Sequence, residues 1–162
     1  MRRILCSLGA AALLAGTASA APITKQAFTK SYKLTLDVGP VETMYTQADV
    51  KMKHPSSGEV IVGSSGSMGM SMGHANHHLE VHVLSRATGK VVTGAKPSIT
   101  LTDESAMGSM KAAEKVDAMA MEGIGQGVSD LHYGDNVQLT PGHTYRVVVV
   151  VDGEKASFAF RA

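Results

Sequence analysis

Three of the chain's seven histidines and one glutamate fall within the eight residues N-H-H-L-E-V-H-V at 76–83. On an extended strand, side chains two residues apart share a face, and their Cα atoms lie about 6.5 to 7 Å apart. An imidazole and a carboxylate at that spacing reach one ion, so His78 and Glu80 form a candidate ligand pair. His82, about 13 Å from His78, is predicted to lie outside the coordination shell, and so is His77. The alternative is an ordinary strand with a solvated polar face.

A second pair of candidate ligands occurs downstream, in S-D-L-H-Y-G at 129–134. An extended backbone would put Asp130 and His132 on one side. The segment M-A-M at 119–121 precedes them and offers a thioether. Two such pairs that converge would supply two imidazoles and two carboxylates to one ion. Taken alone, D-x-H also fits an aspartate that caps a turn beside an exposed histidine.

A methionine-rich loop at 63–74 predicts a different kind of site. It is built of Gly and Ser with alternating Met68, Met70, Met72 and His74, and it offers no apolar surface on which methionine could pack. Thioethers with an imidazole favour soft Cu(I), whereas the carboxylates of the first two pairs favour a borderline divalent ion. The alternative is that the loop's composition has no role in metal binding.

Alternation of apolar and polar residues predicts the strands that must position these side chains. It is clear at 32–38, 79–83 and 98–102. Asp152 and Gly153 predict a tight hairpin turn between two further strands. Many short strands separated by turns predict an all-β fold, an immunoglobulin-like β-sandwich.

Three further segments refine this prediction. The turn P-G-H-T-Y, which ends at Tyr145 and opens a valine-rich strand, is typical of immunoglobulin-like sandwiches. The valines at 147–151 predict a strand covered on both faces, either central in its sheet or at a subunit interface. Residues 104–115 are predicted to form a helical turn or two, because Met107 and Met110 have helical spacing.

The N-terminus has the pattern of a secretory signal peptide. Arg2 and Arg3 precede an apolar run at 4–15, and A-S-A follows before Ala21. We therefore expect residues 1–20 to be removed and 21–162 to form a single exported metal-binding domain. The one cysteine, Cys6, lies in the signal, so any metal site must use His, Met, Asp or Glu.

The charge balance and the motifs that are missing exclude several functions. The whole chain has a formal net charge of +1, and loss of the two signal arginines leaves the domain near −1. Such a balance provides no field to hold nucleic acid or an anionic membrane surface. With no thiol nucleophile and no G-x-S-x-G motif, we expect a binding protein and not an enzyme.

The order of the motifs resembles that of a periplasmic iron-transport family, whose small β-sandwich proteins act beside an inner-membrane iron permease. That family has an M-H-L-E-x-D-I strand, then M-x-M, then D-G-P-H-Y-G-x-N. This chain has H-H-L-E-V-H-V at 77–83, M-A-M at 119–121 and D-L-H-Y-G-D-N-V at 130–137. The opening segment at 36–44 fits more loosely.

The resemblance implies a ligand set for copper or iron made of His78, Glu80, Met121, Asp130 and His132. This sequence departs from the family at three places. Only Leu131 separates the aspartate from the histidine, and residues 123–128 lengthen the path from Met121, which makes Met119 the alternative thioether. In that family a late His-rich loop donates a histidine to the site of the partner subunit in a dimer. Here a short hairpin takes the place of that loop, so His143 or His74 would have to substitute for the donated histidine. A homodimer is therefore an open alternative.

Three function hypotheses follow. The first is an exported protein that captures iron or copper for transport across the inner membrane, with a permease as partner. The second is a periplasmic copper chaperone or resistance protein that uses the methionine-rich loop. The third, of another class, is an immunoglobulin-like structural or protein-interaction module whose histidines face solvent.

Overall fold

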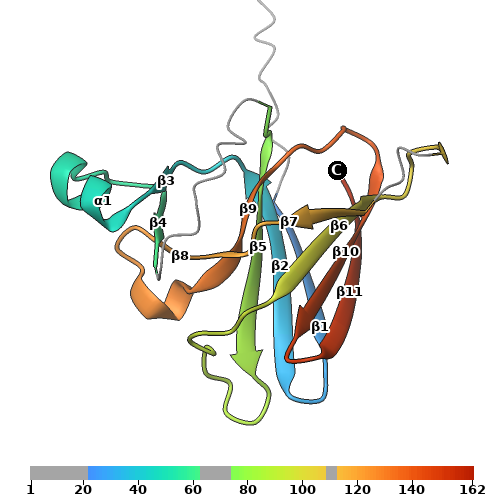
Figure 1. Cartoon of the computed structure of the whole chain (residues 1–162), viewed down its shortest axis with the longest axis horizontal. Helices are drawn as coiled ribbons and strands as arrows, with labels where there is room; N and C mark the ends of the chain where they lie inside the picture. The colour runs from blue at the N-terminus through green and yellow to red at the C-terminus, as the bar shows by residue number, and fades with distance from the viewer. Residues whose placement is uncertain (1–21, 63–73, 109–112) are drawn as a thin grey trace, which may run out of the picture.

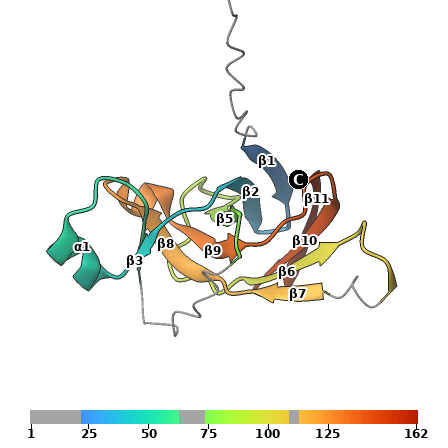
Figure 2. The same cartoon turned by 90° about the horizontal axis from the view of Figure 1, so that it is seen from above.

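The computed structural model describes residues 22–62, 74–108 and 113–162. In this part of the chain two β-sheets pack against each other, and α1 lies at the far end from β10 and β11 (Figures 1 and 2). The prediction of an all-β sandwich is confirmed, and its immunoglobulin-like character stays a prediction. None of the described helices is long and apolar enough to span a membrane.

The larger sheet has seven strands in the order β1-β2-β5-β9-β8-β4-β3. Their bounds are β1 (Ile23–Phe28), β2 (Tyr32–Pro40), β3 (Met44–Tyr45), β4 (Glu59–Ile61), β5 (His77–Ser85), β8 (Met119–Gly123) and β9 (His132–Val137). Neighbouring strands are antiparallel, apart from the parallel pair β3 and β4. The helix α1 (Gln47–Lys53) connects β3 to β4, and the 3-10 helix η2 (Gly127–Asp130) connects β8 to β9.

The smaller sheet has four strands in the order β11-β10-β6-β7. They are β6 (Ser98–Asp103), β7 (Ala113–Val116), β10 (Thr144–Val151) and β11 (Glu154–Arg161). The predicted hairpin is confirmed: Asp152 and Gly153 have φ angles of 48° and 79° and connect β10 to β11. The Tyr145 hydroxyl accepts a hydrogen bond of 2.8 Å from the Thr140 amide, which ties the ring to the backbone just before the P-G-H-T-Y turn.

The core lies between the two sheets and takes every second side chain of their strands. On β2 and β5 the register sets Leu36 opposite Val81, and both are fully buried. Further core residues are Leu34, Val38, Leu79, Val83, Ile99, Val147, Val149 and Phe158. Because side chains alternate along a strand, the polar residues between these apolar ones fall on the opposite face of the larger sheet.

Two expectations for the smaller sheet need correction. The valine strand β10 is central, between β11 and β6, but only Val147, Val149 and Val151 are buried, so its second face is partly exposed. The prediction of a helical turn or two at 104–115 is wrong at its C-terminal end: Gly108 is in a 3-10 turn, but residues 113–116 form the strand β7. There Val116 packs into the core opposite Ile99, and this burial outweighs a helical spacing of methionines.

Some predictions fall outside the described residues. They include the signal peptide at 1–20 and the methionine-rich loop with Met68, Met70 and Met72. Only His74, at the end of that loop, is described, and it is exposed in a turn.

Candidate metal centre

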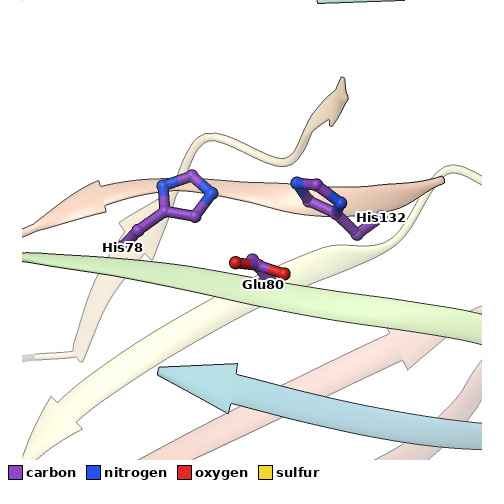
Figure 3. A group of neighbouring side chains, drawn as sticks. All are labelled: His78, Glu80 and His132. Atoms are coloured by element: carbon purple, nitrogen blue, oxygen red, sulfur yellow. The ribbon is translucent and has the colours of Figure 1, made fainter. Parts of the chain in front are cut away.

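His78, Glu80 and His132 come together on the face of the larger sheet that points away from the core (Figure 3). His78 and Glu80 alternate with the core residues of β5, and His132 begins the neighbouring strand β9. Each of the three offers a ligand atom within 4.8 Å of the other two. The structure thus brings together the first predicted pair and one member of the second.

The His78 imidazole is fully buried and held in one orientation. Its Nδ1 atom lies 3.0 Å from Oδ1 of Asn136. Asn136 is itself fixed, because its Nδ2 donates to the Glu42 carbonyl and its Oδ1 accepts from the Glu42 amide. Oδ1 is therefore an acceptor, so Nδ1 of His78 carries the proton and Nε2 presents a lone pair. That Nε2 atom is buried without a hydrogen-bond partner.

His132 shows the same arrangement. It is fully buried, and its Nδ1 atom lies 2.8 Å from the backbone carbonyl oxygen of Asp130. A carbonyl only accepts hydrogen bonds, so Nδ1 is the donor and Nε2 is again the unprotonated nitrogen. Nε2 also has no hydrogen-bond partner. In histidines that ligate metals, the N–H group of the second ring nitrogen usually donates a hydrogen bond to an acceptor such as a carbonyl oxygen in this way.

Charges around the two imidazoles suit cation binding. Burial lowers the pKa of His78, and this favours the neutral ring that a metal needs. Burial also pushes the pKa of Glu80 upward, but its hydrogen bond with His82 and the nearby imidazoles of His132 and His78 hold it below the ordinary value. Glu80 is thus available as a carboxylate.

The two candidate thioethers differ in position. Met121 on β8 lies directly opposite His132 in the register and is fully buried, although it is not part of the hydrophobic core between the sheets. Met119 lies opposite Gly134 and is only partly buried. Of the two, Met121 is the one positioned beside His132.

The extra residues between β8 and β9 form a closed loop that brings Asp130 back to the sheet. The Asp130 carboxylate accepts a hydrogen bond of 2.9 Å from the amide of Gly123. A Cβ atom at Gly123 would stand 2.7 Å from that carboxylate oxygen, so the contact needs glycine there. Asp130 ends η2 and is not on the extended strand expected for it. Its carboxylate lies 4.0 Å from Nδ1 of His132, the ring nitrogen that already contacts the backbone carbonyl of Asp130.

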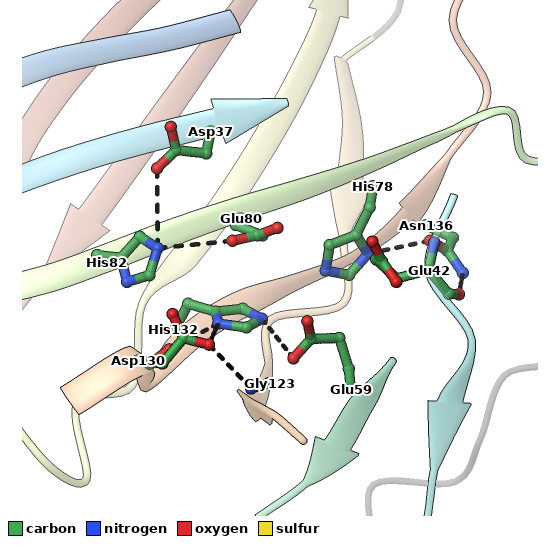
Figure 4. A network of polar contacts seen from close by, with 10 residues as sticks. All are labelled: Asp37, Glu42, Glu59, His78, Glu80, His82, Gly123, Asp130, His132 and Asn136. Carbon is green, nitrogen blue, oxygen red and sulfur yellow. Dashed lines mark hydrogen bonds and ion pairs between the residues drawn. The ribbon is translucent and has the colours of Figure 1, made fainter. Parts of the chain in front are cut away.

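His82 lies beside these residues and belongs with them to one polar cluster (Figure 4). The cluster comprises His78, Glu80, His82, Asp130, His132 and Glu59. The prediction that it lies outside the coordination shell considered only its distance from His78. In the structure its ring centroid is 5.4 Å from that of His132 on the next strand, and its Nε2 is 3.5 Å from Glu80 Oε2. With Asp130 and His132 it forms a second group of close ligand atoms. Burial lowers the pKa of His82, but Glu80, Asp37 and Asp130 together raise it above its ordinary value.

One member of the cluster, Glu59, was missed in the sequence. It begins β4, is only 8% exposed, and places Oε2 at 3.4 Å from Nε2 of His132. Burial, with the negative charges of Glu80, Asp130 and Glu42, raises its pKa to about 7. The only signal in the sequence is a glutamate at the start of the short apolar run E-V-I-V, which does not reveal the neighbouring strand.

The other histidines lie elsewhere. His77 is partly exposed and contacts Asn76, and His74 is exposed. His143 pairs with Asp103 of β6 in the smaller sheet, at 2.7 Å. Neither proposed substitute for a donated histidine, His74 or His143, belongs to the ligand groups found among the described residues.

Comparison with known proteins defines a fold for this chain. No family model matches it, and no curated protein matches its sequence. Among solved structures it is similar to FetP of uropathogenic Escherichia coli strain F11, in its as-isolated form, with a TM-score of 0.53 and 12% identity over 88% of this chain and 95% of that chain. A copper-bound glutamate-to-glutamine variant of FetP gives a TM-score of 0.52 and 13% identity over 86% of this chain and 95% of that one. At these identities the likeness shows that the fold is shared.

Proposed function

We propose that this protein binds a divalent transition-metal ion, copper in first place, between strands β5 and β9. The observation that carries the proposal is the pair of buried Nε2 atoms of His78 and His132, which lack hydrogen-bond partners while both Nδ1 atoms are held by acceptors. A buried polar atom without a partner costs about 1 to 3 kcal/mol. An ion bound by both lone pairs would remove that cost and use the orientation that the Nδ1 contacts impose.

The chemistry of the available donors supports copper. Two imidazoles, the carboxylate of Glu80 and the neighbouring thioether of Met121 form a mixed nitrogen, oxygen and sulfur set, and imidazole-rich sites rank Cu2+ highest among first-row divalent ions. The fold is shared with a protein whose variant was solved with copper bound. Iron is the alternative cargo, and it rests on the family resemblance of the motifs.

The biological role that we propose is capture of the ion outside the cytoplasm. The signal-peptide pattern at 1–20 supports export, and the similar FetP was expressed in the periplasm of E. coli. From there the ion would pass to a permease of the inner membrane. The protein would work by binding and release, with no covalent chemistry.

The test compares the wild-type chain with a His78→Ala/His132→Ala double variant. We expect the wild type, titrated with Cu2+ at pH 7.5, to bind one ion at this site, and the double variant to lose it. His143→Ala serves as the matched control, since it removes an imidazole outside the cluster. Wild type and double variant with equal copper content and affinity would refute the proposal.

The same titration at pH 5.5 tests histidine ligation separately. Protons compete with the metal for the Nε2 lone pairs, so affinity should be lower at pH 5.5 than at 7.5. Equal affinity at the two pH values would argue against imidazole ligands.

A further inference from the structure

Glu59 has a buried carboxylate oxygen for which the surrounding side chains and backbone provide no hydrogen-bond donor. Its Oε2 atom is shielded from solvent and has no hydrogen-bond partner, and its side chain is 11% exposed. Buried carboxylates in proteins are normally held by hydrogen-bond donors, by a cationic side chain or by a metal ion, because an unpaired one is costly. A glutamate at this position therefore calls for a ligand that neutralises it.

The distance from Glu59 to His132 distinguishes an ion pair from two ligands of one ion. Oε2 and Nε2 lie 3.4 Å apart. A charge-assisted hydrogen bond between them would be shorter, at about 2.7 to 2.9 Å. By contrast, a tetrahedral ion with ligand bonds of about 2.1 Å holds any two of its ligand atoms about 3.4 Å apart. The observed spacing matches the edge of a coordination tetrahedron.

The local backbone explains how Glu59 reaches this place. The preceding Gly58 has φ +104°, and a Cβ there would stand 2.5 Å from the Thr43 carbonyl oxygen, so this turn requires glycine. The Glu59 amide then donates to the same carbonyl. Pairing of β4 with β8 sets Ile61 opposite Met121, and Met121 lies opposite His132. Glu59, two residues from Ile61, therefore shares the sheet face of the two ligand candidates.

Figure 4 shows Glu59 of β4 beside His132 of β9, with His78 and Glu80 of β5 in the same cluster. The ligand atoms of His78, Glu80 and His132 lie within 4.8 Å of one another; Glu59 stands at the edge of this group and contacts it through His132, at 3.4 Å. We infer that Glu59 is a direct ligand of the ion bound by His78 and His132, so that one chain supplies two imidazoles and two carboxylates. The inference rests on the proposed function and adds a ligand from β4, which belongs to neither sequence motif. Two anionic ligands favour a divalent cation over Cu(I).

The experiment uses Glu59→Gln, which keeps the shape and removes the charge. We expect Cu2+ affinity at pH 7.5, measured in competition with a chelator, to fall about 10- to 100-fold. We also expect the electron paramagnetic resonance spectrum of bound Cu2+ to change, because a ligand atom is altered. Glu122→Gln is the matched control: Glu122 lies on β8 opposite Val60, on the other face of the same strand pair, and both readouts should stay as in the wild type.

A second variant, Glu59→Asp, separates ligation from simple attraction of charge. It keeps the negative charge but withdraws the oxygens by one methylene, so a direct ligand loses affinity while a distant charge retains it. This variant also serves as the test if Glu59→Gln does not fold.

The possible outcomes distinguish the two proposals. Wild-type affinity and an unchanged spectrum in Glu59→Gln, together with copper loss in the double histidine variant, would overturn the role of Glu59 and leave the proposed function in place. Retained affinity in Glu59→Asp would also reject direct ligation. Equal binding by the wild type and the double histidine variant would instead overturn the proposed function.

Discussion

Both faces of β5 carry fully buried side chains, but the two faces differ in what the buried atoms contact. On the core face Val81 is 0% exposed and packs among apolar side chains; on the other face His78 is also 0% exposed, but its Nε2 atom has no hydrogen-bond partner. Burial alone therefore does not distinguish core residues from candidate metal ligands in this sheet. They differ in whether each buried polar atom has a hydrogen-bond partner.

The two faces should also make opposite contributions to stability. A fully buried aliphatic side chain on the core face stabilises the fold by about 1.5 to 3 kcal/mol. Each unpartnered polar atom on the other face costs about 1 to 3 kcal/mol in the metal-free protein. The following predictions test this contrast, in order of decreasing effect.

The largest effect is expected at the core face. Leu36→Ala removes a fully buried side chain opposite Val81 and should lower the free energy of unfolding by about 2 to 5 kcal/mol. Urea denaturation of the metal-free protein measures this. The copper affinity of the folded variant should not change, because Leu36 lies on the other side of the sheet. A stability loss below about 1 kcal/mol would mean that this face is loosely packed.

The next effect is the stabilisation by metal. With free Cu2+ at a hundred times the dissociation constant, the free energy of unfolding should rise by about 2.7 kcal/mol in the wild type. Leu36→Ala should gain the same increment from its lower starting point, whereas His132→Ala should gain none. The same gain in His132→Ala would show that copper stabilises the fold from another place.

A smaller effect, of opposite sign, is expected for metal-free Glu59→Gln. The pKa of Glu59 is about 7 in the folded chain, against an ordinary value near 4.5, so ionisation of Glu59 lowers the free energy of unfolding. This loss of stability is absent below about pH 4.5, increases as the pH rises, and is complete above about pH 7. The variant should therefore be more stable than the wild type at pH 8, by about 1 to 3 kcal/mol, and equally stable at pH 4.5. Urea midpoints at both pH values measure this, and a destabilised variant at pH 8 would contradict it.

The smallest effect is expected at His143, which immediately precedes β10 of the smaller sheet. Its hydrogen bond holds the pKa of Asp103 below the usual range, so the stability from this pair is present above about pH 4 and is lost as Asp103 becomes protonated. His143→Ala should unfold at slightly lower urea concentration than the wild type at pH 5, and the gap should narrow as the pH is lowered and Asp103 becomes protonated. Copper affinity should stay the same; a weakened site would show that this pair communicates with the cluster.

Much of the fold could be predicted because strand periodicity is local. The alternation at 79–83 was enough to place His78 and Glu80 on the face opposite Leu79 and Val81. The helical reading of 104–115 failed at its C-terminal end, because residues 113–115 pair with β6; Met107 is 86% exposed, so it does not pack in the core. Local spacing does not contain that distant pairing.

The site was harder to predict than the strands. The meeting of His132 with His78 depends on the register of β9 beside β5, and only the order of the motifs suggested it. The same register brings His82 beside His132, which spacing along one strand could not reveal. Glu59 was missed because β4 pairs with β8, about sixty residues later in the chain, through contacts that no short motif encodes.

The position of β4 has a consequence for how fast an ion could leave. This strand joins the sheet through three residue pairs with β8, and its outer neighbour β3 has two residues. Short peripheral strands open more often than central ones such as β5. An ion ligated from both would lose one ligand whenever β4 detaches and would then dissociate faster, without unfolding of the sandwich. Amide hydrogen exchange in β4 and the dissociation rate of the ion should then rise and fall together.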